Sequence, residues 1–495
     1  MEGESVRDLR QGTTAARILR AATMMLAALT LAGCLFSSGG VTISDPVPDT
    51  PHPPSGESAI GQREHPRVVA AYGGVYEDPG AERAIARIVG RLVASSEDPS
   101  QSYQITILNS PVVNAFALPG GYLYITRGLL ALVNDSSELA AVIAHEMAHV
   151  TAKHAIARLQ RAKEKAFVAQ VVARVVDDPQ KAQSAIASAE LSFARFSQAQ
   201  ELEADAVGVK TLARAGYDPH AAARFLMAMS RFAQVNGAGA GNKQPDFLSS
   251  HPTTPERIEK AKFAARAISG TGIGIRDRAA YLENVNGMLF DDDPSEGFVR
   301  GRTFLHAKLG IAFTAPVGYT MENTADAVLA TNGTGTALRF DGTNIPKTMA
   351  LDDYLRSGWI NGLIEDSIRT TTIDGHPLAT ASAVADGWSF RIAVLRVEGM
   401  SYRFIFASRT PGAALDKAFN DTVESFRMLS KAERDRLQPL RIRVRKVKAG
   451  ETAESLADQM KGIPADRRAA LFRVLNGLED GEEPETGMLV KLVTE

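Results

Sequence analysis

The sequence has very little cysteine: Cys34 is the only one among 495 residues. A single thiol excludes an intrachain disulfide framework and a zinc site built from several cysteines. Neither sign of charge dominates, because 55 Lys and Arg residues stand against 57 Asp and Glu residues, for a formal net charge of −2. This balance does not favour a nucleic-acid-binding protein or a polybasic membrane-binding surface.

Long apolar runs are also lacking. The apolar run at residues 21–31 is too short for a membrane-spanning helix, which needs about 20 apolar residues. It follows Arg17 and Arg20 and is followed by small residues, which is the order of a signal peptide. We therefore predict a signal peptide over residues 1–33.

The cysteine stands directly after this run. The segment Leu31-Ala32-Gly33-Cys34 resembles the lipobox of bacterial lipoproteins, which implies cleavage before Cys34 and lipidation of that cysteine. Leu35 follows instead of the Asp that retains such proteins in the inner membrane, so the resemblance implies the periplasmic face of the outer membrane. A plain signal peptide and a buried N-terminal helix remain as alternatives.

Composition divides the rest of the chain into four parts. Residues 34–60 hold five prolines among Ser, Gly and Asp, which indicates a flexible tether behind the lipidated cysteine. Residues 61–270 read as mainly helical with a small β-hairpin, and residues 296–430 as an α+β domain closed by a helix at 419–429. Residues 441–495 read as a small β-α-α-β module. The predicted fold class is thus multidomain.

Two of these parts show weak family resemblances. Residues 296–430 loosely resemble PsbP-like domains, which carries no chemistry. The last part contains Gly450-Glu451-Thr452 and Val474-Leu475-Asn476-Gly477, and it resembles a LysM carbohydrate-binding module. That resemblance implies peptidoglycan as a partner, although the second half of this part of the chain contains several acidic residues.

The strongest motif is His145-Glu146-Met147-Ala148-His149, an H-E-x-x-H sequence. Asp135 and Glu138 predict a capping box before a helix from Ser136 to about Leu159. Residues four apart lie on one face of a helix, about 6 Å from each other, so both imidazoles can reach one metal ion. Glu146 is rotated by about 100° from His145, which places it beside the ion as a general base.

A catalytic zinc needs a third protein ligand and an open position. Ala152 and Ala155 occupy the places where a metzincin has Gly and a third His, and His154 is predicted to face solvent. Glu201 and Asp205 are four apart on a second helical stretch, with Glu203 nearly opposite. One carboxylate can bind the metal while the other orients a ligand histidine. A solvated acidic helix face is the alternative.

Together these motifs resemble the HtpX/BepA-type gluzincin metallopeptidases (peptidase family M48), over about residues 65 to 270. Further matches are Asn114 to Gly121, Arg127 to Leu130, and Ser250-His251-Pro252 with Arg257. The resemblance implies one Zn²⁺ per chain, held by His145, His149 and Glu201, with Glu146 as catalytic base. Asp205 would not bind the metal but would accept a hydrogen bond from a ligand histidine. Gln198 departs from the arginine usual in the family, which puts a substrate-binding role of that arginine in doubt.

The resemblance also implies how substrate and regulation work. An extended peptide would pair with an edge strand that contains Asn114, Ala115, Phe116 and Ala117. Backbone hydrogen bonds between the peptide and this strand would supply the affinity. His251 follows a glycine-rich segment at 237–242 that we predict to be mobile, and it would gate the zinc or serve as fourth ligand. The alternative is that His251 caps the helix at 255–261.

These inferences predict a zinc metalloendopeptidase of the bacterial cell envelope that hydrolyses misfolded or unassembled envelope proteins, and no role with nucleic acid. Two alternatives use the same features. One is a chaperone-like assembly factor with little proteolysis, and the other is a peptidoglycan-associated binding protein.

Overall fold

The computed structural model describes residues 56–163, 179–237, 251–333 and 335–495, with backbone alone for 179–196 and 236–237. The predicted signal peptide, Cys34 and residues 238–250 lie outside the described residues. Within the described ranges, we find no helix that is both long and apolar enough to cross a membrane.

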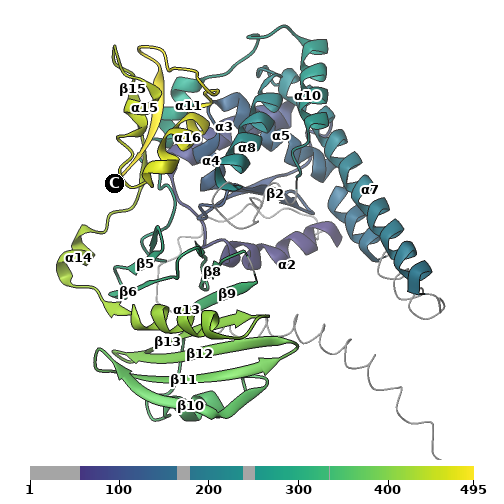
Figure 1. Ribbon diagram of the computed structural model, residues 1–495. Coiled ribbons are helices and arrows are strands. Elements are labelled where there is room, and N and C mark those ends of the chain that lie inside the picture. Colours follow the sequence, from purple (N-terminus) through teal and green to yellow (C-terminus); the bar gives the residue numbers. More distant parts are fainter. Residues whose placement is uncertain (1–55, 164–178, 238–250, 334) are drawn as a thin grey trace, which may run out of the picture. The chain divides into compact units, whose positions relative to one another are not determined.

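The first region is mainly helical (Figure 1). The described residues of this region include the helices α2 (Gly56–Ala71), α3 (Pro79–Ser95), α4 (Arg127–Leu132), α5 (Ser136–Thr151), α7 (Pro179–Arg214), α8 (Ala221–Gly237), α10 (Pro255–Ile268) and α11 (Arg278–Val285). The start of α2 corrects the predicted tether, because residues 56–60 are helical. Gly61 of α2 approaches so close to Tyr122 that an added Cβ would lie 2.4 Å from its ring.

A small sheet accompanies these helices. It has the order β1-β3-β2, with β1 at Gln104–Leu108, β2 at Ala115–Leu118 and β3 at Tyr122–Thr126. The hairpin of β2 and β3 is antiparallel, as predicted, and Gly120 and Gly121 take the positive φ angles of its turn. β1 pairs parallel to β3, which leaves β2 at an edge of this sheet.

The second region is rich in sheet. A seven-stranded sheet has the order β10 (Leu363–Ile373), β11 (His376–Ala385), β12 (Trp388–Val397), β13 (Met400–Ser408), β9 (Thr336–Thr343), β8 (Val328–Thr331) and β7 (Thr320–Asn323). A four-stranded sheet has the order β14 (Arg427–Met428), β6 (Ile311–Thr314), β5 (Thr303–His306) and β4 (Phe298–Arg300). Two helices, α12 (Leu351–Arg356) and α13 (Ala413–Glu424), complete it.

Strand β12 shows how this sheet is buried on both faces. Ala393 and Leu395 belong to the cluster that includes residues of α13 and the four-stranded sheet, whereas Ile392 and Val394 belong to the cluster under α12. This alternation is the period of two expected for a strand. The predicted closing helix at 419–429 was placed too late, because α13 ends at Glu424 and β14 then pairs with β6.

The C-terminal module has the predicted β-α-α-β order: β15 (Arg441–Lys446), α15 (Ala453–Ala457), α16 (Ala465–Asn476) and β16 (Leu489–Thr494). A short helix, α14 (Lys431–Arg436), precedes it. Its apolar residues share one buried cluster with α3, α4 and α5. The amine of Lys491, fully buried, donates to the carbonyls of Ala131, Leu132 and Val133 at 2.7, 3.2 and 2.7 Å. The module is therefore packed into the core of the helical region.

Candidate metal centre

The centre is built on α5. Asp135 caps its N-terminus by accepting a hydrogen bond from the Glu138 amide, and every residue from Ser136 to His149 is buried. The predicted reciprocal capping box is absent here, because the Glu138 carboxylate accepts from the Asn134 amide instead. α5 also ends earlier than predicted: Lys153 has a φ of 56°, a left-handed conformation that interrupts the helix before it resumes at 154.

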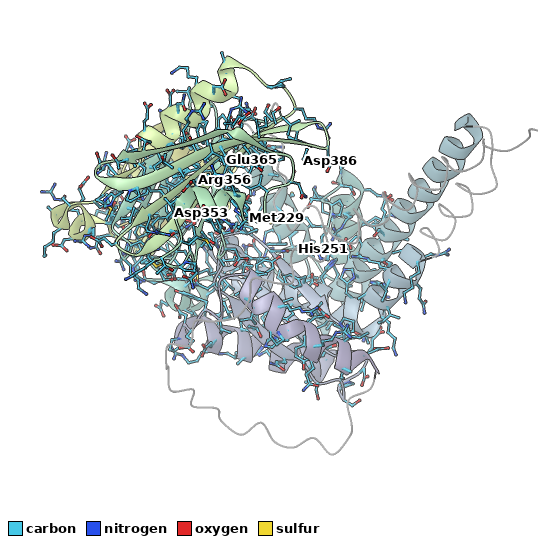
Figure 2. All side chains as sticks on the ribbon, turned by 90° about the horizontal axis from the view of Figure 1, so that it is seen from below. Met229, His251, Asp353, Arg356, Glu365 and Asp386 are labelled. Atoms are coloured by element: carbon cyan, nitrogen blue, oxygen red, sulfur yellow. The ribbon has the colours of Figure 1, made fainter. Side chains whose placement is uncertain are left out.

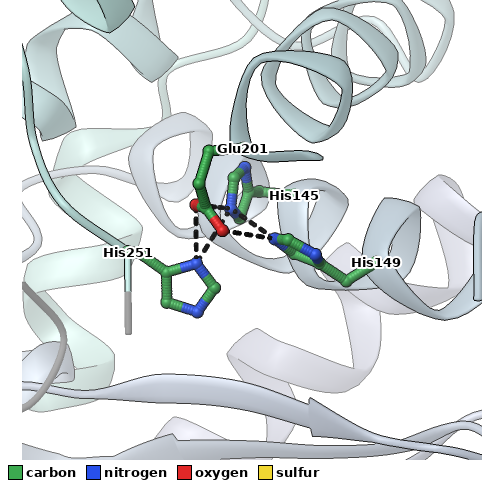
Figure 3. A group of neighbouring side chains, drawn as sticks. All are labelled: His145, His149, Glu201 and His251. Atoms are coloured by element: carbon green, nitrogen blue, oxygen red, sulfur yellow. Dashed lines mark hydrogen bonds and ion pairs between the residues drawn. The ribbon is translucent and has the colours of Figure 1, made fainter. Parts of the chain in front are cut away.

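Four donor groups converge beside this helix. His145, His149, Glu201 and His251 are all buried, and one donor atom from each lies within 4.8 Å of the others (Figure 3). Nε2 of His145 lies 3.0 Å from Nε2 of His149 and 3.3 Å from Glu201 Oε2. His149 Nε2 lies 3.5 Å from Glu201 Oε1. Tetrahedral zinc with bonds of about 2.0–2.1 Å requires donors about 3.3 Å apart, so these groups fit a zinc ion.

A second layer fixes the His145 ring. Its Nδ1 lies 3.0 Å from Asp205 Oδ1, and Arg257 donates to both Asp205 oxygens at 2.7 and 2.8 Å. Burial opposes protonation of His145, but the bonds to Asp205 and Glu201 outweigh it and raise the pKa of His145 to about 9. A carboxylate behind a ligand histidine selects the tautomer that presents Nε2 to the metal. The structure thus brings Asp205 to His145, and the role of Asp205 in orienting a metal ligand stays a prediction.

Glu201 is surrounded by donors. Arg158 donates to its Oε1 at 2.6 Å, and Arg257 Nη1 lies 3.1 Å from its Oε2. Burial would raise the pKa of Glu201, but hydrogen bonds from His145 and His251 hold it well below its usual range. The carboxylate is therefore ionised, which is the form that binds a metal.

His154 corrects one prediction. The structure buries it, with Nδ1 2.8 Å from His149 Nδ1 and Nε2 3.4 Å from Glu203 Oε2. It does not face solvent because the left-handed Lys153 turns the chain after α5. Glu203 itself is exposed and touches the centre only through His154.

Glu146 differs from the four donors. It is buried, its Oε1 has no hydrogen-bond partner, and His251 Nε2 is 3.6 Å from that oxygen. Burial raises the pKa of Glu146. A carboxylate that is held beside the donors, and whose proton affinity is raised, suits the role of a general base.

His251 is brought to the donors and does not cap α10. Its Nδ1 lies 2.8 Å from Glu201 Oε2 and 3.3 Å from His145 Nε2. The cap of α10 is Thr254, whose side chain accepts from the Arg257 amide. Figure 2 labels His251 in the helical region, whereas Asp353 and Glu365 mark the sheet-rich region. The predicted mobile segment, from residue 238 onward, lies outside the described residues.

Sequence reasoning missed the roles of Arg158, Arg257 and His154. Arg257 is 2% exposed and lies four and eight positions before Ala261 and Ala265, the other buried residues of α10. An arginine on the same helix face as two alanines is a sequence signal for a buried carboxylate partner. Arg158 and His154 follow the break after α5, and the sequence pattern continued the helix through that break.

The comparisons with known proteins agree with this geometry. Residues 79–265 match the model of the family described as Peptidase family M48. A beta-barrel assembly-enhancing protease of Yersinia pestis is 28% identical over 197 residues, which cover 38% of this chain and 40% of the relative. The mitochondrial metalloendopeptidase OMA1 of Schizosaccharomyces pombe is 28% identical over 176 residues, 36% of this chain and 50% of the relative. The chain thus spans half or less of these relatives' lengths.

One solved structure bears on the PsbP resemblance. The solution structure of a cyanobacterial PsbP from Synechocystis matches with 15% identity and a TM-score of 0.19, over 32% of this chain and 97% of that one. This TM-score is too low to show a shared fold.

Proposed function

We propose that the protein, whose residues 79–265 match the model of peptidase family M48, is a zinc metalloendopeptidase that hydrolyses misfolded or unassembled proteins of the bacterial cell envelope. The observation that carries the proposal is the convergence of His145, His149, Glu201 and His251 around one point, with Glu146 beside them. In this proposal His145, His149 and Glu201 hold the metal.

The residues divide the chemistry between them. When bound, Zn²⁺ acidifies a water molecule and polarises the scissile carbonyl. Glu146 accepts the proton of the attacking water and later passes it to the leaving amine. Asp205, held by Arg257, keeps His145 in the tautomer that binds metal through Nε2.

Strand β2 is the proposed docking edge for substrate. Its residues pair with β3 on one side, and it lies at the end of the strand order. Leu118 of β2 and His149 line one small cavity, so a peptide added to this strand would pass the metal ligands. The Phe116 ring is tilted against Tyr72 and stacked on Tyr124, with ring centroids 5.4 and 4.9 Å away, and these contacts hold the strand in place.

The envelope location rests on the leader and on the Yersinia pestis relative, which is named for beta-barrel assembly. We propose that the mature protein begins at a lipidated Cys34 on the periplasmic face of the outer membrane. Mass spectrometry of the mature N-terminus and membrane fractionation test this. Cys34→Ser should yield an unprocessed or soluble form, and an unmodified N-terminus elsewhere would refute it.

The direct test of the activity is zinc analysis combined with casein cleavage. We expect about one zinc per chain, casein cleavage that a chelator stops, and recovery when zinc is restored. A chain that binds zinc and unfolded outer-membrane proteins without cleaving casein would favour the chaperone-like alternative.

Peptidoglycan is a second proposed partner, because the last part of the chain has the β-α-α-β order of the LysM resemblance. Sedimentation of the full chain with purified peptidoglycan tests it. Removal of the module is unsuitable as a control, since its residues belong to the core of the helical region. A chain that stays in the supernatant would remove this partner.

A further inference from the structure

A second, larger cavity lies at the other end of the β2 segment. It has a volume of about 240 Å³ and is lined by Asn109, Arg127, Asp292, Asp293, Glu296 and Glu322, among others. Pro111 and Val112, which lead into β2, also line it. None of these residues belongs to the metal centre.

Arg127 contributes an unsatisfied donor. Its side chain is 1% exposed, Nε donates to Asn109 Oδ1 at 2.7 Å, and Nη1 donates to the Leu289 carbonyl at 3.3 Å. Nη2 is buried and has no hydrogen-bond partner. A buried donor without a partner costs stability, so an acceptor inside the cavity, from water or from a ligand, would satisfy this group.

The carboxylates of the cavity outnumber this one guanidinium. Asp292, 7% exposed, accepts from the Val299 amide at 2.6 Å, and Asp293 accepts from Asn109 Nδ2 at 2.9 Å. Burial and the neighbouring Asp291 raise the pKa of Asp292 to about 7. Burial also raises the pKa of Glu296. With Glu322, four acidic residues and one basic residue, Arg127, line the cavity, while Arg300 and Lys308 act on Asp292 and Glu296 from nearby. The excess of acidic residues in the lining favours a positively charged group.

The two cavities flank one strand. Val112 lines the larger cavity, and Leu118 lines the smaller one together with His149. Val112 lies in a bend three positions before β2 begins at Ala115, and Leu118 is the last residue of β2. A polypeptide that pairs with β2 and continues past Ala115 would therefore run from the smaller cavity beside His149 toward the larger one.

We propose that the larger cavity binds a lysine or arginine side chain of a polypeptide lying along β2, while Arg127 Nη2 donates to a main-chain carbonyl of the same polypeptide. The placement of this polypeptide rests on the proposed peptidase function. The binding itself does not require cleavage, so the two can fail separately.

The test uses the full chain with Glu146→Gln and measures fluorescence anisotropy. Two pools of labelled peptides are used, each of about 14 residues, which is long enough to span the strand. Every position except one central position is a random choice among Ala, Thr, Val and Gln. The two pools differ only in this central residue, lysine or acetyllysine. Charge-assisted hydrogen bonds in a half-buried site should make the Kd of the lysine pool about tenfold lower.

Removal of the acidic groups should abolish this preference. We expect Glu296→Gln with Glu322→Gln to bring the two Kd values together, and Glu296→Gln alone to narrow the gap. Glu424→Gln, the same change at an exposed position of α13, should leave the preference intact. Equal Kd values in the parent protein would overturn the proposal, as would a preference that survives in the double variant with an unchanged melting curve. If the wild-type protein does not cleave casein, that result would instead count against the proposed peptidase function.

Discussion

The Nδ1 atom of His251 lies 2.8 Å from Oε2 of Glu201, and its Nε2 atom lies 3.6 Å from Oε1 of Glu146. One imidazole thus contacts both a proposed metal ligand and the proposed base. We propose that in this position it would compete with a metal-bound water when zinc is present. This geometry agrees with a latent resting state that substrate must open.

If His251 closes the site, His251→Ala should retain zinc and cleave casein faster, by about tenfold if the closed state is about 90% populated. Cleavage rates and zinc content measure this, with His376→Ala in the sheet-rich region as a matched control. A slower enzyme would show that His251 stabilises the transition state, and unchanged kinetics would refute both roles.

The third ligand can be separated from its neighbours on α7. Glu201→Ala should lose zinc, because the carboxylate that faces His145 and His149 is removed. Glu203→Ala should keep zinc and activity, since Glu203 reaches His149 only through His154. Metal analysis of the purified variants decides between them, and equal zinc occupancy in Glu201→Ala and wild type would contradict the assignment.

Asp205→Ala should weaken zinc affinity without abolishing it, by about 10- to 100-fold, as the loss of a group behind a ligand histidine does. The physical reason is that His145 loses the acceptor on Nδ1. Competition with a chelating dye gives the affinity. An affinity equal to that of the wild type would mean that the His145 ring is held by other contacts.

The C-terminal module should stabilise the helical region that carries the site. Lys491→Met leaves the Ala131, Leu132 and Val133 carbonyls without their donor, which should cost about 3 kcal/mol of unfolding free energy. Thermal melting of the full chain measures this, with the exposed Lys448→Met as control. An unchanged melting temperature would show that the carbonyls find other donors.

Much of the centre could be predicted because its information is local. The spacing of His145 and His149, the cap at Asp135 and the hairpin turn at Gly120 each depend on neighbouring residues. Local rules on period and capping therefore predicted the helix that carries the two histidines and the hairpin with its edge strand.

The remainder depends on contacts between distant segments. Arg257 meets Asp205 from another helix, 52 positions away, and Lys491 meets Ala131 across 360 positions. The sequence around Lys153 has the pattern of a continuous helix, but tertiary contacts outweigh this local preference and the helix breaks there. The break changes the direction of His154. Neither periodicity nor propensity carries such information, which is why these partners appeared only in the structure.

The most direct test of the central claim is zinc content and casein cleavage measured on one preparation of Glu146→Gln. Glu146 is buried beside the donors, and its Oε1 has no hydrogen-bond partner. We therefore predict zinc occupancy equal to that of the wild type and cleavage lower by about 10²- to 10⁴-fold. Zinc content that falls together with activity, or cleavage at the wild-type rate, would contradict Glu146 as the general base.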